Sequence, residues 1–203
     1  AVSREHAPRA AAAGAVVIDN TSEFRRDADV PLVVSEVNPH AIAEYTRRNI
    51  IANPNCSTMQ LMVALAPLHR EARVERINVA TYQSVSGTGR RALEELGRQT
   101  AGLLNFQSAN PEVYPVQIAF NVIPHGGDFD DNGYTSEEMK LVHETRKILG
   151  DDAIGVNATV VRVPVFYGHS EAVAIETRDR LDPERARELL RAAPGIEVVD
   201  EPR

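Results

Sequence analysis

The sequence has little of what disulfide-rich, membrane-spanning or nucleic-acid-binding proteins need. Its 203 residues include one cysteine, so no internal disulfide can form and nothing points to an oxidising compartment. No apolar run approaches the ~20 residues that cross a bilayer. The alanine-rich start at 10–13 is too short and too interrupted by charge for a signal peptide. A net charge of −7 argues against nucleic-acid and anionic-membrane partners. We expect a cytoplasmic protein.

The composition that is present fits an ordinary globular protein, with 43% apolar and 25% charged residues. A chain of this length can bury one substantial core, or one domain and part of another. It opens without Met in a helical pattern at 3–13 and closes on an apolar run at 196–199, which predicts a strand. We expect both ends to be cuts through a larger fold.

The order of the predicted elements is typical of an α/β fold. Apolar runs at 15–18, 32–34 and 50–52 predict buried strands, separated by a polar loop at 19–31 and a helix at 39–47. Later strands are predicted at 77–82, 156–164 and 172–177, and helices at 57–69, 90–104, 136–149 and 183–192. Pro67 is expected to end or bend its helix early. Thr135 and Glu138 form a capping-box pattern at the start of the third of these helices.

The single cysteine, Cys56, lies in Asn53-Pro54-Asn55-Cys56-Ser57-Thr58, between a short apolar run and a helical one. This pattern predicts strand, tight turn and helix, with the thiol at the helix N-terminus. Unsatisfied N–H groups and the positive end of the helix dipole stabilise a thiolate at such a place. Cys56 is therefore a candidate nucleophile if a histidine serves it. The alternative is a buried structural thiol.

The strongest candidate for that histidine is His169, which follows a strand in a glycine-containing loop. A loop histidine can equally be solvated and idle. Arg162, seven residues earlier, interrupts an apolar strand. It is either a cation reaching solvent at a sheet edge or a planar fork aimed at a carboxylate.

Other polar residues are weaker signals one by one. Gln83 ends a strand, where the sites of α/β proteins collect. The turn that holds Ser86 and Gly87 could bind an anion or simply connect a strand to a helix. Arg25 could be solvated or could bind phosphate. Glu137 and Lys140 share a helix face and could form an ordinary surface pair.

The order of these motifs is more specific than any one of them. The cysteine motif is followed by Thr81-Tyr82-Gln83-Ser84-Val85-Ser86-Gly87, Glu137-Glu138-Met139-Lys140 with Glu144-Thr145, Arg162-Val163-Pro164-Val165 and His169-Ser170-Glu171. In this order, and with Asp19-Asn20-Thr21-Ser22-Glu23-Phe24-Arg25 before them, they closely resemble aspartate-semialdehyde dehydrogenase over nearly the whole chain.

The resemblance implies an NADP-dependent enzyme of lysine, methionine and threonine biosynthesis that works through an acyl-thioester on a cysteine. By this likeness Cys56 is the nucleophile, His169 the general acid/base, and Gln83 orients the substrate. The resemblance also implies that Arg162 binds the substrate carboxylate and Glu137 the substrate amine. It further implies that Arg25 and Lys140 bind phosphate, and that Ser86 and Gly87 contact the cofactor. It also implies a homodimer, a small-molecule substrate with phosphate, and no metal.

The resemblance further implies two domains. Residues 1–55 would be the C-terminal part of a Rossmann-type dinucleotide-binding domain, and 56–203 an α+β catalytic and dimerisation domain with a mixed sheet, incomplete at its C-terminus. The family's glycine-rich cofactor loop has no counterpart before residue 15. Two alternatives stay open: N-acetyl-gamma-glutamyl-phosphate reductase, against which Gln83 argues, and an inactive truncated homologue that acts as an interaction module.

Overall fold

The structure is a computed structural model that describes residues 2–201. By its internal contacts the chain forms two compact units. The first comprises the described parts of 1–77, 140–156 and 175–203, and the second comprises 78–139 and 157–174. The second unit interrupts the first twice in sequence. Among the described residues, no helix is long and apolar enough to span a membrane.

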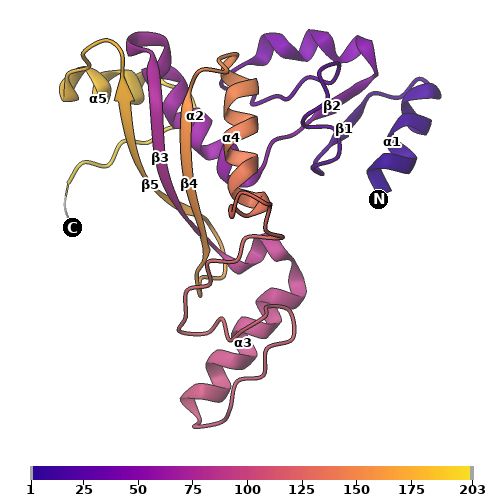
Figure 1. Cartoon of the computed structure of the whole chain (residues 1–203), viewed down its shortest axis with the longest axis vertical. Coiled ribbons are helices and arrows are strands. Elements are labelled where there is room, and N and C mark those ends of the chain that lie inside the picture. The colour runs from indigo at the N-terminus through magenta and orange to yellow at the C-terminus, as the bar shows by residue number, and fades with distance from the viewer. Residues whose placement is uncertain (1, 202–203) are drawn as a thin grey trace. The chain divides into compact units, whose positions relative to one another are not determined.

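The first unit begins with helix α1 (Val2–Ala12), followed by strand β1 (Val17–Asp19), the 3-10 helix η1 (Pro39–Arg47) and strand β2 (Ile50–Ala52). Strands β1 and β2 pair in parallel, with Val17 opposite Ile50, and Leu32 adds a parallel bridge to Ala52. Parallel neighbours joined by crossovers are typical of α/β domains, so the predicted class is confirmed for this part. Figure 1 shows α1 beside this small sheet.

One predicted property of β1 is wrong, because the apolar run is not buried. Ile18 is 75% exposed and Val16 is 51% exposed. Successive side chains of a strand point to opposite faces, and within residues 2–201 only one face of β1 is covered. The predicted strand at 196–199 is also wrong, since this segment has no regular secondary structure.

Helix α2 (Cys56–Ala72) follows β2 directly, and its buried stripe includes Leu61, Met62 and Leu65. The prediction that Pro67 ends or bends this helix early is wrong about its end, because the helix continues for five residues to Ala72. The residues around Pro67 are buried, and this burial offsets the one backbone hydrogen bond that proline cannot make. Helix α5 (Pro183–Ala192) packs against α2, and Glu71 and Arg185 form an ion pair there.

A three-stranded sheet has the order β4-β3-β5, made by β3 (Val74–Gln83), β4 (Gly155–Arg162) and β5 (Ser170–Thr177). The Val163 N–H donates to Gln83 O at the end of β3, so β4 runs parallel to it. The Arg178 N–H donates to Arg73 O at the beginning of β3, so β5 runs antiparallel. The predicted mixed sheet is therefore confirmed, and Figure 1 shows β3 between its two neighbours.

The second unit has its own core around helix α3 (Arg90–Leu104), which follows the short helix η2 (Val85–Thr88). Ala92 and Leu96 of α3 pack against Ile118 and Ile123 of the long loop that follows. Buried Glu95 accepts hydrogen bonds from the backbone N–H groups of Glu112 and Val113, and thereby fixes that loop. Helix α4 (Ser136–Leu149) comes next.

Candidate functional site

Cys56 is the first residue of α2, as the sequence predicts. Asn55 is the N-cap, and its side-chain oxygen accepts a hydrogen bond of 3.0 Å from the Ser57 N–H. The Cys56 Sγ lies 4.0 Å from the same oxygen. The thiol is exposed in the described chain, so the alternative of a buried structural thiol does not fit. The thiol therefore lies at the first position of a 17-residue helix.

Arg25 is buried, and its side chain binds three partners in the first unit. Its Nε donates to Asn53 O at 2.8 Å, its Nη2 donates to Asn20 O at 3.1 Å, and its Nη1 pairs with Glu144 Oε1 at 3.0 Å. The alternative of a solvated charge is therefore wrong. A guanidinium has five N–H donors, so these three bonds do not use all of them. Phosphate binding by Arg25 stays a prediction.

Two further residues of α4, Glu144 and Lys147, secure the same region, and the sequence predicted no role for either of them. The second oxygen of Glu144 accepts a hydrogen bond of 2.7 Å from the Asn55 N–H. Lys147 Nζ donates to the carbonyl oxygens of Arg25, Asp27 and Val30 at 2.9, 2.6 and 2.8 Å. Burial lowers the pKa of Lys147. The sequence does hold one sign of their importance: positions 137, 140, 144 and 147 are three or four residues apart and therefore lie on the same side of a helix.

The start of α4 has the predicted capping box. The Thr135 N–H donates to Glu138 Oε2 at 2.7 Å, and the Glu138 N–H donates to Thr135 Oγ1 at 3.4 Å. The other Glu138 oxygen accepts from the Val160 N–H, so this carboxylate is used in the structure of the turn. Glu137 and Lys140 are both half-buried on the same helix. Their roles toward substrate and phosphate stay predictions.

His169 is held in the second unit by the turn after β3. The Ser84 N–H donates to His169 Nδ1 at 3.0 Å, and Ser84 Oγ lies 3.2 Å from the same nitrogen. Burial lowers the pKa of His169, and the nearby Arg162 cation adds to this effect. This lowered pKa favours the neutral form of the ring. Because Nδ1 accepts a backbone hydrogen bond, the ring proton is assigned to Nε2, which can donate to a developing oxyanion.

Gly87 faces both Arg162 and His169. A methyl group added at Gly87 would lie 3.5 Å from Arg162 Nη1 and 3.7 Å from His169 Nε2. A guanidinium and an imidazole thus both lie within contact distance of the position that a Gly87 side chain would take. Among residues 2–201 the Arg162 guanidinium forms no ion pair. A half-buried cation in this state is suited to a carboxylate ligand.

Gln83 and Ser86 lie on either side of Ser84. Gln83 ends β3 and is buried, and Ser86 Oγ lies 2.9 Å from Ser84 Oγ. The predicted site residues thus fall in two groups. Arg25, Cys56 and Lys140 belong to the first unit, and Gln83, Ser86, Gly87, Glu137, Arg162 and His169 belong to the second.

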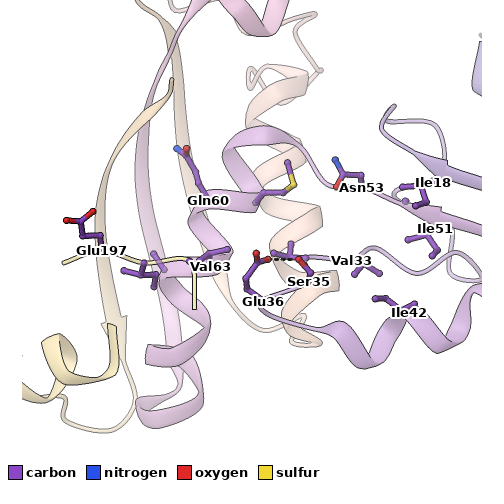
Figure 2. Close-up of a pocket in the computed structure, with 16 residues that line it drawn as sticks. Ile18, Val33, Ser35, Glu36, Ile42, Ile51, Asn53, Gln60, Val63 and Glu197 are labelled. Atoms are coloured by element: carbon purple, nitrogen blue, oxygen red, sulfur yellow. Dashed lines mark hydrogen bonds between the residues drawn. The ribbon is translucent and has the colours of Figure 1, made fainter. Parts of the chain in front are cut away.

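An apolar cavity of about 830 Å³ lies in the first unit, beside β1, β2 and α2 (Figure 2). Its apolar lining includes Ile18, Val33, Ile51 and Val63, and Ser35 donates a hydrogen bond to Glu36 at its edge. It contains none of the predicted site residues. Within the described part of the chain, no cluster of three His, Cys, Asp or Glu side chains could hold a metal ion.

A family model for the semialdehyde dehydrogenase dimerisation domain matches residues 65–203, and one for the semialdehyde dehydrogenase NAD binding domain matches 1–45. The chain belongs to the semialdehyde dehydrogenase family. The matches do not test the predicted domain boundary at 55/56, which stays a prediction.

Within this family the chain is similar to aspartate-semialdehyde dehydrogenases. It is 60% identical to the enzyme of Legionella pneumophila over 98% of this chain and 58% of that protein. A crystal structure of aspartate semialdehyde dehydrogenase II from Vibrio cholerae, complexed with ASA, matches with a TM-score of 0.96 and 57% identity over 100% of this chain and 61% of that chain.

A structure of the Candida albicans enzyme with NADP matches more distantly, with a TM-score of 0.69 and 27% identity over 94% of this chain and 52% of that chain. The chain spans about three fifths of the length of the curated relatives it matches. The predicted resemblance is confirmed, and the comparisons give no support to N-acetyl-gamma-glutamyl-phosphate reductase.

Proposed function

We propose that this chain is the catalytic part of an NADP-dependent aspartate-semialdehyde dehydrogenase. The reaction is the reductive dephosphorylation of L-aspartyl 4-phosphate to L-aspartate 4-semialdehyde, in lysine, methionine and threonine biosynthesis. The observation that carries the proposal is the similarity to enzymes of that name along nearly the whole chain. The exposed Cys56 at the start of α2 supplies the nucleophile that this chemistry needs.

In the proposed reaction the Cys56 thiolate attacks the carbonyl carbon of the acyl phosphate, the S–C bond forms, and phosphate leaves. NADPH, when bound, supplies the hydride that reduces the thioester. The resulting thiohemiacetal expels the thiolate and releases the aldehyde. His169 donates its Nε2 proton as negative charge develops on the carbonyl oxygen, and recovers a proton when that oxygen again becomes a carbonyl.

The proposal assigns a binding side chain to each charged group of the substrate. Arg162 binds the carboxylate, and Glu137 binds the amine. Arg25 and Lys140 bind the phosphate, while Gln83 orients the reacting carbonyl with a neutral amide that adds no charge of its own. Support for the Arg162 role is its guanidinium, which forms no ion pair among the described residues and faces the space at Gly87.

Ser86 and Gly87 are the proposed cofactor contacts of this chain. The residues fit such a group, since Gly87 presents backbone without a side chain at a position where a Cβ would already contact Arg162 and His169. Ser86 and Gly87 also lie in the turn that precedes the N-terminus of α3. The choice of NADP over NAD is part of the proposal.

A homodimer and a cytoplasmic location complete the proposal. The dimerisation-domain family match supports the homodimer. The molar mass in solution, measured by light scattering, tests the homodimer.

NADP reduction in the reverse direction tests the activity. The full-length protein is assayed with phosphate and either L-aspartate 4-semialdehyde or N-acetyl-L-glutamate 5-semialdehyde, beside a Cys56→Ser variant and a Gln60→Ala control one turn along α2. We expect activity with the first aldehyde, loss in Cys56→Ser and little change in Gln60→Ala. Preference for the second aldehyde would overturn the substrate. No activity together with an unreactive Cys56 would favour the interaction module.

A further inference from the structure

Glu144 is a buried carboxylate that lies in the middle of α4 and is only 2% exposed. Each of its two oxygens binds a different segment of the first unit. One pairs with Arg25 Nη1 at 3.0 Å, and the other accepts the Asn55 N–H at 2.7 Å. A buried carboxylate needs such partners, because desolvation without them is costly.

These contacts lead directly to the thiol. Asn55 precedes Cys56 and is the N-cap of α2, and its side chain binds the Ser57 N–H. Arg25, the ion-pair partner of Glu144, also holds the carbonyl oxygen of Asn53 at 2.8 Å. Glu144 therefore fixes the turn before Cys56 at two points, once directly and once through Arg25.

The ion pair also removes an electrostatic cost. A lone carboxylate near a thiolate would disfavour it, since like charges repel. The Arg25 guanidinium cancels that charge, so the carboxylate can hold the turn without opposing the thiolate. Glu144 thus combines hydrogen bonding to the turn with near-zero net charge beside the helix N-terminus.

We propose that Glu144 is a positioning residue for the Cys56 thiol, which keeps the N-cap and the thiol fixed at the positive end of α2. As a contribution to catalysis this inference rests on the proposed function. The effect of Glu144 on the Cys56 thiol can be measured without substrate or cofactor. The positioning role of Glu144 and the proposed enzymatic function can therefore fail separately.

The experiment measures the rate of iodoacetamide alkylation at Cys56, the single cysteine of the chain, at fixed pH. The rate of the native protein is divided by the rate of the same variant in guanidinium chloride. Glu144→Gln is combined with Arg25→Gln, because the single change would leave the Arg25 cation unpaired and favour the thiolate. Together the two changes weaken the contacts to the turn and leave the net charge of the pair unchanged. We expect this ratio to fall about three- to fivefold, the size of a helix-terminus effect. Glu144→Asp, with its shorter arm, should give an intermediate value.

Leu141→Ala is the matched control. Leu141 is fully buried one turn earlier on α4, so its truncation destabilises the same helix without touching the turn. We expect its alkylation ratio to equal that of the unchanged protein. If the double variant does not fold, as judged by circular dichroism, Glu144→Asp becomes the test. An unchanged ratio in the folded Glu144 variants, or an equal loss in Leu141→Ala, would overturn the proposal.

Discussion

Arg25 and Glu144 lie 119 residues apart in the sequence and form a buried ion pair, with 3.0 Å between Arg25 Nη1 and Glu144 Oε1. Their side chains are 8% and 3% exposed. The pair joins the loop after β1 to α4, and the remaining contacts of both residues converge on the turn before Cys56. Its removal should therefore affect stability as well as chemistry.

The first prediction concerns this pair. Arg25→Met leaves the Glu144 charge buried without its partner, and we expect the free energy of unfolding to fall by about 3–5 kcal/mol. The measurement is urea unfolding followed by circular dichroism. Arg185→Met breaks the exposed pair with Glu71 in the same unit and should cost far less, because solvent screens exposed charges. Similar losses in the two variants would contradict the buried role of Arg25.

Arg162 should behave in the opposite way. Its guanidinium forms no ion pair within residues 2–201, so Arg162→Gln should change the free energy of unfolding by no more than about 0.5 kcal/mol. If Arg162 binds the substrate carboxylate, the KM for aspartate semialdehyde should rise about 10- to 100-fold, since charge-assisted hydrogen bonds are lost. Steady-state kinetics of the full-length protein measure this. An unchanged KM would argue against the role.

Gly87 should tolerate one carbon atom and no more. A methyl group there would make ordinary contacts of 3.5 Å and 3.7 Å, so Gly87→Ala should fold normally. Gly87→Val would place further atoms between Arg162 and His169, and we expect at least a tenfold loss of kcat/KM, on the order of the effects of misplaced catalytic groups. Gly97→Ala, within α3, is the control. Equal activity of the valine and alanine variants would show that this space is not used.

Acid should destabilise the fold through His69. Its ring is 8% exposed and accepts the Val74 N–H at 3.2 Å. Burial lowers its pKa, with the Arg73 cation as a further cause. The unfolded chain therefore binds this proton first as the pH falls, and the stability that neutral His69 contributes is present above about pH 6.5 and is lost below it.

Urea midpoints at pH 7.5 and 5.5 measure this effect. His69→Gln keeps an acceptor for the Val74 N–H but cannot gain a proton, so its midpoint should fall less over this range. His169 has the same direction of pKa shift, and part of the loss should persist in the variant. An identical fall in both proteins would exclude His69 as a cause.

Local signals in the sequence predict much of this fold. Helix α3 has the predicted bounds. Gly89, with φ of +99°, ends the short helix η2, and the apolar residues that follow it have helical spacing. The capping box of Thr135 and Glu138 is visible in four consecutive residues. Cys56 begins a helix because Asn55 is a good N-cap. In each of these cases the deciding interactions lie within a few positions of each other.

The errors and omissions depend on distant parts of the chain. Pro67 is tolerated because tertiary packing outweighs a local penalty, and Ile18 is exposed because no described layer covers it. The Arg25–Glu144 pair and the Lys147 contacts join residues more than a hundred positions apart. A charge on a helix gives no sign in the sequence of which distant carbonyl or guanidinium it will meet.

The residues at 137, 140, 144 and 147 lie along one side of α4, and their spacing along the helix must be kept for all of them to act. Glu137 and Lys140 are proposed substrate and phosphate ligands, and Glu144 and Lys147 hold the turn and loop before Cys56. Each residue of an α-helix advances by about 100° around its axis. Inserting or deleting one residue between 140 and 144 would therefore rotate Glu137 and Lys140 by about 100° around the helix axis relative to Glu144 and Lys147. Natural variation in length should avoid this stretch.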